Sequence, residues 1–277
     1  MQNTIHFISG LPRSGSTLLS AILRQNPRFR AAMSSPVGPI FNATLAAMGA
    51  ENEFAVFLDQ QQKRDILMGI FDGYYRDRSP DQVIFDTNRM WTSRLPALVE
   101  LFPQARVICC VRDPAWVLDS VERLVRRNAL DVSRIFNNAS ERATVFSRAE
   151  ALGHRQRMIG YALSALQEAY YGEHAKRLLL VDYDLLSARP AETLGLIYGF
   201  LGEDPFKHDF DDVAYEAEEF DARLMAKGLH SVRSKVTHSP RRTILPPQLF
   251  RQFQGYRFWG PDRGAGAHQI VPDPDET

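Results

Sequence analysis

The residues best suited to chemistry lie near the start of the chain, in the stretch FISGLPRSGSTLL. Gly10 and Gly15 enclose four residues, and Ser16 and Thr17 follow at the expected start of a helix. A strand–turn–helix of this kind presents backbone N–H groups and the positive end of a helix dipole to an anion. Arg13 adds a planar cation that suits phosphate. The stretch therefore predicts an anion-binding loop.

This loop differs from the usual nucleotide-binding loop, which carries a Lys between its second Gly and the Ser/Thr. Here Ser16 follows Gly15 directly, and the positive charge sits inside the loop at Arg13. Without a Lys to reach terminal phosphates, a nucleotide kinase is disfavoured. The remaining alternative is a glycine turn followed by a Ser/Thr helix cap, with no ligand.

A second stretch, RVICCVRDPAWVLDSVERL, repeats the strand–turn–helix pattern. Arg112 stands at the expected strand end, and Ser120 lies eight residues further on within the next helix. Asp113 and Pro114 are a good helix cap and first helical residue. Arg112 and Ser120 could together hold a second phosphate. The alternative is an Arg that merely pairs with the capping Asp.

Regular alternation of strands and helices would position both stretches. Short apolar runs predict buried strands at Thr4–Ser9, Val83–Asp86, Arg106–Val111 and Arg177–Tyr183. Longer patterns predict helices at roughly Ser16–Gln25, Glu53–Tyr75, Thr92–Leu101, Pro114–Arg126, Ser140–His174 and Pro190–Leu201. This order indicates a single α/β domain whose central parallel sheet is flanked by helices. Ligands of such sheets bind at the carboxyl ends of the strands.

Composition and charge exclude some classes of function and location. The chain has 277 residues, and 33 Lys and Arg balance 33 Asp and Glu, so no global field attracts nucleic acid or an anionic membrane. No apolar run is long enough to predict membrane insertion, and no signal peptide is evident. The cysteines Cys109 and Cys110 are adjacent on an expected strand and point to opposite faces, which disfavours a disulfide. We expect a cytoplasmic protein.

The last part of the chain is less regular. The basic stretch HSVRSKVTHSPRRTILPP predicts a loop that folds over another part of the protein. From about residue 260 the sequence holds turn-forming residues and acids without periodicity, which predicts a flexible tail. We therefore expect a domain over residues 1–259 and a tail over residues 260–277.

Several site classes lack their motifs. The seven histidines include no His-Glu-x-x-His pair, and there is no Cys-x-x-Cys, so no metal site is expected. The absence of Gly-x-Ser-x-Gly disfavours a serine hydrolase. The absence of Gly-x-Gly-x-x-Gly after a strand disfavours a nicotinamide enzyme.

Taken together, the two stretches resemble the sulfotransferases that use 3′-phosphoadenosine 5′-phosphosulfate (PAPS). The resemblance implies that Arg112 and Ser120 bind the 3′-phosphate of the donor. It also explains the loop, because this donor has no β- and γ-phosphates and requires neither the kinase Lys nor magnesium. The resemblance assigns the 5′-phosphosulfate to Leu11, Pro12, Arg13, Ser14, Gly15, Ser16 and Thr17.

Three further stretches extend the resemblance over roughly residues 4–255. Tyr183 matches a family Tyr that lies near the adenine. The basic stretch looks like the donor-covering loop of the tyrosylprotein branch, which implies donor contacts from Ser234 and from Arg241 or Arg242. LPRSGSTLL is also nearer that branch than the cytosolic small-molecule branch, which usually has Lys in the loop.

The catalytic base departs from the family pattern. The tyrosylprotein branch has a Glu after the first helix, where this chain has Ser34, and the cytosolic branch has Lys and His where this chain reads FDTNRMW. Arg13 would stabilise charge on the transferring group, Arg89 could replace the Lys, and Asp86 could serve as the base. The alternative for Asp86 is a cap at the strand end.

We therefore expect sulfuryl transfer from PAPS to an acceptor hydroxyl, with tyrosine in an acidic peptide as the expected acceptor class. The basic run Arg233, Lys235, Arg241 and Arg242 could attract such a peptide. The alternatives are a small-molecule, sugar or lipid acceptor, a nucleotide kinase, or a module that binds the nucleotide without catalysis. The sequence leaves the oligomeric state open, a homodimer included.

Overall fold

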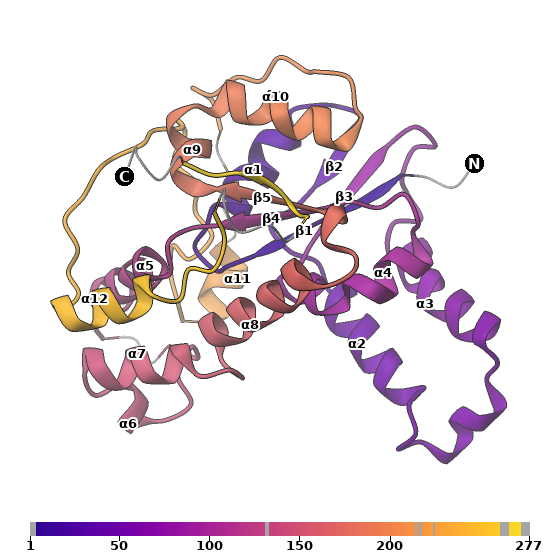
Figure 1. The fold of residues 1–277 in the computed structure, drawn as a ribbon, viewed down its shortest axis with the longest axis horizontal. Coiled ribbons are helices and arrows are strands. Elements are labelled where there is room, and N and C mark those ends of the chain that lie inside the picture. The colour runs from indigo at the N-terminus through magenta and orange to yellow at the C-terminus, as the bar shows by residue number, and fades with distance from the viewer. Residues whose placement is uncertain are drawn as a thin grey trace.

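The described structure is built around one central sheet with helices on both of its faces (Figure 1). The computed structural model describes residues 4–130, 133–213, 215, 218–223, 225–260 and 266–272. Within these residues the strands form one six-stranded sheet with the order β2-β3-β1-β4-β5-β6. Every neighbouring pair is parallel, which confirms the expected α/β fold with a central parallel sheet.

The four expected strands are confirmed within one residue at each end. Two short strands at opposite edges of the sheet, β2 and β6, were not predicted. The strands are β1 (Ile5–Gly10), β2 (Phe29–Ala31), β3 (Val83–Thr87), β4 (Val107–Val111), β5 (Leu178–Asp182) and β6 (His268–Ile270).

The two longest expected helices, Glu53–Tyr75 and Ser140–His174, are each interrupted. The Asp59 side chain, for example, accepts a hydrogen bond from the N–H of Gln62 at 2.8 Å and starts a new helix. The helices Val37–Ala47, Tyr183–Ala188, Glu218–Arg223 and Pro247–Gln254 were not predicted. The α-helices are α1 (Ser16–Leu23), α2 (Val37–Ala47), α3 (Gln60–Tyr74), α4 (Leu95–Leu101), α5 (Pro114–Arg127), α6 (Ala139–Arg142), α7 (Val145–Gly153), α8 (Met158–Tyr171), α9 (Tyr183–Ala188), α10 (Pro190–Leu201), α11 (Glu218–Arg223) and α12 (Pro247–Gln254). The 3-10 helices are η1 (Glu53–Phe57), η2 (Arg89–Arg94) and η3 (Ala175–Arg177).

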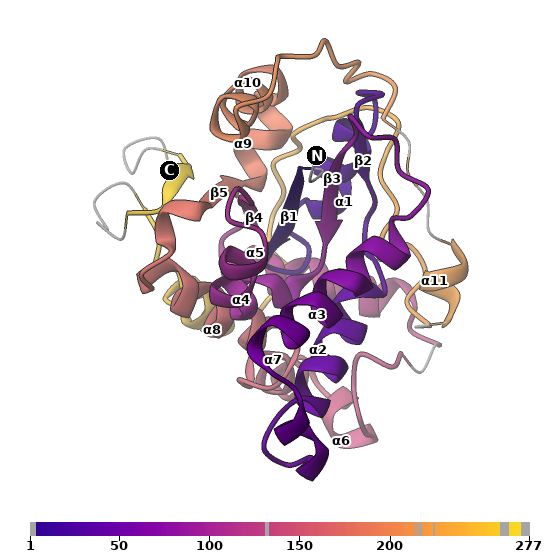
Figure 2. The same ribbon diagram turned by 90° about the vertical axis from the view of Figure 1, so that its right-hand side faces the viewer.

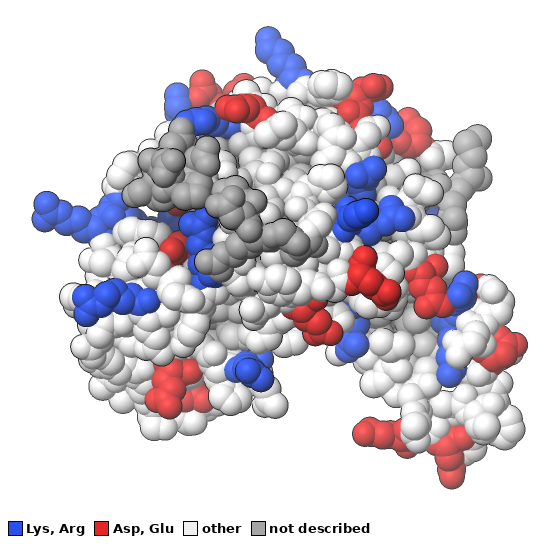
Figure 3. Space-filling model, in the orientation of Figure 1, with Lys and Arg blue, Asp and Glu red and all other residues white. Residues whose placement is uncertain are grey.

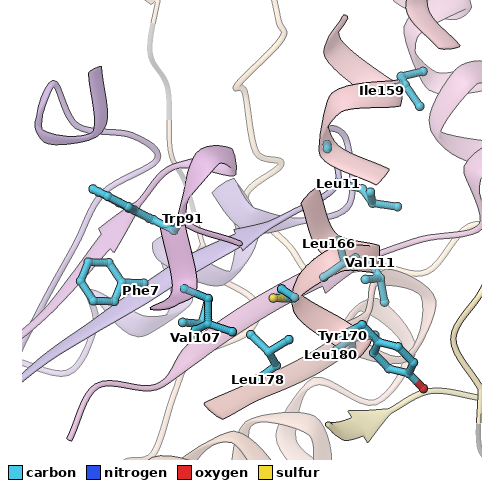
Figure 4. Close-up of a cluster of buried hydrophobic side chains, with 14 of the residues drawn as sticks. Phe7, Leu11, Trp91, Val107, Val111, Ile159, Leu166, Tyr170, Leu178 and Leu180 are labelled. Carbon is cyan, nitrogen blue, oxygen red and sulfur yellow. The ribbon is translucent and has the colours of Figure 1, made fainter. Parts of the chain in front are cut away.

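Helices cover both faces of the sheet, as Figures 1 and 2 both show: α9 and α10 lie on one side of the strands, and α4, α5 and α8 on the other. Alternate strand residues therefore enter two separate cores. Phe7 and Val107 join the core beneath α8 (Figure 4), whereas Ile8 and Ile108 join the core beneath α1 and α10.

The same alternation separates the two cysteines. Cys109 belongs to the first core and Cys110 to the second, and both are free and fully buried. Burial raises the pKa of the Cys110 thiol to about 12. These thiols are therefore packing groups that stay protonated.

The prediction of a flexible C-terminal tail is wrong for part of residues 260–277. Residues 268–270 form β6, which pairs with β5 and buries Ile270. The Gln269 amide donates to the Tyr170 hydroxyl at 3.1 Å and accepts from the N–H of Gly260 at 3.0 Å. These contacts fix the position of β6, which could not be predicted from the sequence pattern. The rest of the predicted tail, residues 261–265 and 273–277, lies outside the described residues.

Acidic and basic side chains are both present over the face shown in Figure 3. This agrees with a formal net charge of zero. None of the described helices is both long and apolar enough to cross a membrane. In Figure 3 the lower edge of the molecule is indented between the lobe that contains α2 and α3 and the lobe that contains α6 and α7.

Candidate active site

The expected anion-binding loop connects β1 to α1 at the carboxyl edge of the sheet. Three of its residues adopt positive φ angles: Gly10 (106°), Arg13 (59°) and Gly15 (92°). A Cβ atom at Gly10 would lie 2.2 Å from the carbonyl oxygen of Cys110, so only glycine fits there. Arg13 is in a conformation that costs a non-glycine residue free energy. The chain keeps Arg13 in this conformation, and its side chain reaches the neighbouring strand–helix unit.

That neighbouring unit is the second predicted element. Asp113 accepts from the N–H of Ala115 at 2.8 Å, which confirms the expected helix cap. The Arg13 Nε donates to the Ser120 hydroxyl at 3.1 Å. Arg13 therefore joins the loop to the helix that carries Ser120, and the two predicted anion sites form one continuous surface.

Tyr183 supplies the third side of this surface. The Arg112 guanidinium stacks over the Tyr183 ring at 4.3 Å from its centroid, and it contacts Asp184 at 3.4 Å. A Cβ atom at Gly15 would lie 2.8 Å from the Tyr183 ring. Tyr183 therefore packs closely against the loop, and the carboxyl ends of β1, β4 and β5 contribute to the same site.

The polar groups at this site suit an anion. Among the described residues, no hydrogen-bond partner faces the buried Nε of Arg112, although this residue is only 9% exposed. No side chain of the described residues caps the N-terminus of α1. Buried donors of this kind are rare unless a ligand satisfies them. The site thus fits a ligand with anionic oxygen atoms.

The charges at this site also favour the binding of an anion. Burial lowers the pKa of the Arg13 guanidinium, Tyr183 and Asp221 oppose this change, and the cations Arg112 and Arg241 lower it further. An anion bound among the three arginines would reduce their mutual repulsion. Within the described residues no group of three His, Cys, Asp or Glu could hold a metal ion.

Residues 229–245, which we call the covering segment, extend over this site as a loop. The carbonyl of Leu229 accepts a hydrogen bond from Arg13. Arg241 pairs with Asp119 at 3.1 Å and stacks on Trp116 at 5.6 Å. The segment is therefore attached to both predicted anion-binding elements.

The three predicted residues of this segment differ in position. Burial lowers the pKa of Arg241, and the nearby Arg112 lowers it further. The exposed Ser234 is held through its carbonyl, which accepts from the N–H of Val213 at 2.6 Å. The exposed Arg242 accepts from Arg123 through its carbonyl. Arg241 thus lies at the site, whereas the contacts described for Ser234 and Arg242 are made by their backbone carbonyls.

Asp119 is a positioning residue that the sequence patterns missed. Its fully buried carboxylate accepts from Arg123 at 2.8 Å, from Thr243 at 3.0 Å and from the N–H of Ile244 at 2.8 Å. These bonds attach the covering segment to α5. The Asp119–Arg123 spacing of four residues within a helix was the available signal. It could not reveal the long-range partners.

The expected base, Asp86, is enclosed by the protein. Its carboxylate is 0% exposed and accepts from Ser35 at 2.6 Å, Tyr75 at 2.7 Å and Trp91 at 2.8 Å. Burial raises its pKa, and the three donors oppose this change. Because protein groups already use this carboxylate, the geometry supports a structural role for Asp86. It does not support the predicted role as base.

Arg89 lies at the start of η2, directly beyond β3. Its carbonyl accepts from the Ser9 hydroxyl at 3.1 Å, which fixes the start of η2 against the end of β1. The residue keeps exposed surface, although desolvation by neighbouring atoms lowers its pKa and Tyr161 opposes that change. Arg89 is thus available on the side of the loop opposite Arg112.

An anion-binding loop at the carboxyl edge of a parallel sheet, with a second arginine–serine element beside it, defines a group-transfer enzyme of the nucleotide-donor type. Residues 6–208 match the model of a family described as the sulfotransferase family. The match covers well over half of the chain, which therefore belongs to the sulfotransferase family. A comparison with curated proteins gave no match.

Solved structures agree with this fold. A sulfotransferase from Alicyclobacillus acidocaldarius is 13% identical with a TM-score of 0.52, over 81% of this chain and 92% of its own. Mouse sulfotransferase SULT7A1, solved as a complex with PAP, is 15% identical with a TM-score of 0.52, over 92% of this chain and 83% of its own. A sulfotransferase domain from the curacin biosynthetic pathway is 17% identical with a TM-score of 0.51, over 96% of this chain and 95% of its own. These identities establish a shared fold only.

Proposed function

We propose that the protein transfers a sulfuryl group from PAPS to an acceptor hydroxyl. The observation that carries this proposal is the convergence of Arg13, Arg112 and Ser120 at the uncapped N-terminus of α1, with the Arg112 Nε buried and unpaired among the described residues. The donor offers two separate anionic groups, which suits two adjacent anion sites. The PAP complex of the mouse enzyme supports the same donor class.

Each part of the donor has a proposed partner. The loop from Leu11 to Thr17 would hold the 5′-phosphosulfate through backbone N–H groups, and Arg112 with Ser120 would hold the 3′-phosphate. Tyr183 would lie near the adenine, and Arg241 would close the site from the covering segment. Ser234 and Arg242 remain proposed donor contacts.

The proposed reaction is an in-line displacement at sulfur. The acceptor oxygen approaches opposite the bridging oxygen of the phosphosulfate, so positioning and charge stabilisation supply most of the catalysis. Arg13 lies between the two anion sites and would stabilise the charge that develops on the leaving phosphate. Arg89 would act from the acceptor side.

For the acceptor we propose a phenolic hydroxyl, such as tyrosine in an acidic peptide. The loop and the covering segment resemble the tyrosylprotein branch, and a phenol with an ordinary pKa of about 10 needs only a weak base. The attracting charge is smaller than the sequence suggests, because Lys235 pairs with Asp211 at 2.7 Å and Arg241 with Asp119. Arg233 and Arg242 are the exposed cations that remain.

A second acceptor class has its own support. The lobe of α2 and α3 exposes Phe54 (65%), Val56 (80%) and Phe57 (77%) on η1. Exposed apolar groups clustered in this way favour an acceptor with an apolar part, such as a lipid or a small hydrophobic alcohol. The indentation beside this lobe in Figure 3 is the proposed approach for either class.

One assay separates these possibilities. Labelled PAPS is incubated with acidic tyrosyl peptides, simple phenols, sugars and lipids, with a magnesium chelator and at low and high salt. We expect sulfation that survives the chelator, and sulfation of peptides that falls steeply with salt. Activity confined to sugars or alkyl alcohols would contradict the phenolic acceptor. Phosphate transfer that requires magnesium would favour a kinase. Donor binding without any transfer would favour a module that only binds the nucleotide.

The cellular location and assembly stay proposals as well. We propose a reducing compartment such as the cytoplasm, because both cysteines are free and buried. The structure is of one chain, so a homodimer is tested by measuring the mass in solution.

A further inference from the structure

A histidine and a buried carboxylate face each other at the start of the covering segment, and neither residue was among the site residues predicted from the sequence. The Nδ1 of His230 lies 2.6 Å from the Oδ1 of Asp221, and the N–H of His230 donates to the Oδ2 at 3.0 Å. Asp221 is 2% exposed, and the His230 side chain 21%. The carboxylate therefore fixes both the backbone and the ring of this histidine.

This pair lies next to the cations of the site. Leu229, the residue before His230, accepts a hydrogen bond from Arg13 through its carbonyl. The charges of Arg13 and Arg89 both act on the His230 ring, and Asp221 acts on Arg13. His230 therefore follows directly on the residue that Arg13 contacts, and its ring lies within the electrostatic reach of both Arg13 and Arg89.

The carboxylate predicted as the base, Asp86, is less accessible than His230. Asp86 is fully buried and accepts hydrogen bonds from Ser35, Tyr75 and Trp91, whereas His230 keeps exposed surface. When the Nδ1–H donates to Asp221, the lone pair of a neutral imidazole lies on Nε2. A ring held in one tautomer by a carboxylate is the usual arrangement of a histidine base.

We propose that His230 is the general base of the sulfuryl transfer and that Asp221 positions it; this inference rests on the proposed function. The acceptor O–H gives its proton to the Nε2 of His230 while its oxygen forms the new bond to sulfur. The bond between sulfur and the bridging oxygen breaks, and adenosine 3′,5′-bisphosphate leaves with that electron pair. The proton passes from the imidazolium to solvent after the product dissociates.

The electrostatic setting agrees with this role. Burial lowers the pKa of His230, and Arg13 and Arg89 lower it further, whereas Asp221 opposes the shift. The imidazole is therefore neutral at pH 7 and ready to accept a proton. Such a base is weak, which matches a phenolic acceptor better than an alkyl alcohol.

The test compares His230→Asn with the wild type and with His174→Asn. The Asn amide can still donate to Asp221 but cannot accept a proton. His174 is a matched control, because it also pairs with a carboxylate (Glu173, 3.2 Å) in another region of the chain. We expect His230→Asn to lower turnover by about 100-fold to 10,000-fold, as for loss of a general base, and the affinity for adenosine 3′,5′-bisphosphate to change little. His174→Asn should match the wild type.

Two further measurements separate a base from a structural residue. A nitrophenol acceptor is ionised near neutral pH, so His230→Asn should lose far less activity with it than with tyrosine. Added imidazole should restore part of the turnover of His230→Ala. Full tyrosine sulfation by His230→Asn, or equal losses with both acceptors, would overturn the proposal.

The positioning role of Asp221 has a distinct signature in the pH profile. Turnover requires neutral His230, so it should fall as the pH drops through a value below 6.5. Asp221→Asn removes the anion that raises the pKa of His230, so this acidic limb should move to lower pH while maximal turnover decreases. An unmoved limb would overturn the assignment. A wild type that transfers no sulfate would instead contradict the proposed function itself.

Discussion

At the scale of single residues, Arg112 allows the sharpest test of donor recognition. Arg112→Ala should weaken binding of 3′-phosphorylated nucleotides by about 2 to 3 kcal/mol, as for hydrogen bonds to charged groups. Adenosine 5′-phosphosulfate lacks the 3′-phosphate and should bind almost equally to both proteins. Titration calorimetry measures both ligands, with the exposed Arg64→Ala as control. Equal losses for both ligands would show that Arg112 does not recognise the 3′-phosphate.

Arg13 should affect the reaction more than the binding of its donor. Its guanidinium joins Ser120 to the covering segment and faces the proposed leaving group. Loss of one preorganised donor at a developing charge lowers turnover by about 100-fold to 1,000-fold. We expect Arg13→Ala to show such a loss in turnover and a smaller rise in the donor dissociation constant. A larger effect on binding than on turnover would instead mark Arg13 as a ground-state contact.

The residue scale also shows what sequence can predict. Arg13, Arg112 and Ser120 could be proposed from the sequence because each belongs to a contiguous strand–turn–helix pattern whose geometry is local. Asp119 and the pair Asp221–His230 were missed, since their partners depend on how distant segments pack. The enclosure of Asp86 could not be predicted for the same reason, because its three donors come from three separate parts of the chain.

At the scale of elements, the turn before α1 couples the loop to α9. Gly15 has a φ of 92°, and an added Cβ would meet Tyr183 at 2.8 Å. Gly15→Ala should therefore lower stability by about 1 to 2 kcal/mol through the left-handed backbone, and should also displace Tyr183 from Arg112. Donor affinity should fall with it.

Gly202 provides the matched control for this substitution. It has a φ of 74° at the end of α10, and an added Cβ would meet no atom within 4 Å. Gly202→Ala should lower thermal stability similarly and leave donor affinity unchanged. Loss of donor affinity in both variants would mean that backbone strain, and not Tyr183, causes the effect of Gly15→Ala.

Prediction of the elements succeeded where burial was continuous. The strands β1, β3, β4 and β5 are fully buried and mostly apolar, and such runs are recognisable without tertiary information. The edge strands β2 and β6 have three residues each and pair with a single neighbour. Their conformation is imposed by the adjacent strand, so no sequence pattern marks them.

At the scale of the whole molecule, stability should depend on pH through the buried His6 in β1. His6 is 2% exposed, and its Nδ1 accepts from the N–H of Arg106 at 3.2 Å. Burial, with a smaller contribution from Arg106, lowers the pKa of His6 to about 4. The native state keeps His6 neutral, whereas the unfolded chain binds a proton at His6 below about pH 6.5.

The sign of this effect is fixed by proton uptake. Because the unfolded state binds more protons between pH 6.5 and 4, stability is complete above this range and is lost as the pH falls through it. The pKa difference corresponds to a loss of about 2 kcal/mol at pH 5 relative to pH 7. His6→Gln keeps an acceptor but does not titrate, so its free energy of unfolding should decline less between these values. Urea unfolding of both proteins at pH 7, 6 and 5 measures the difference, and parallel declines would contradict the role of His6.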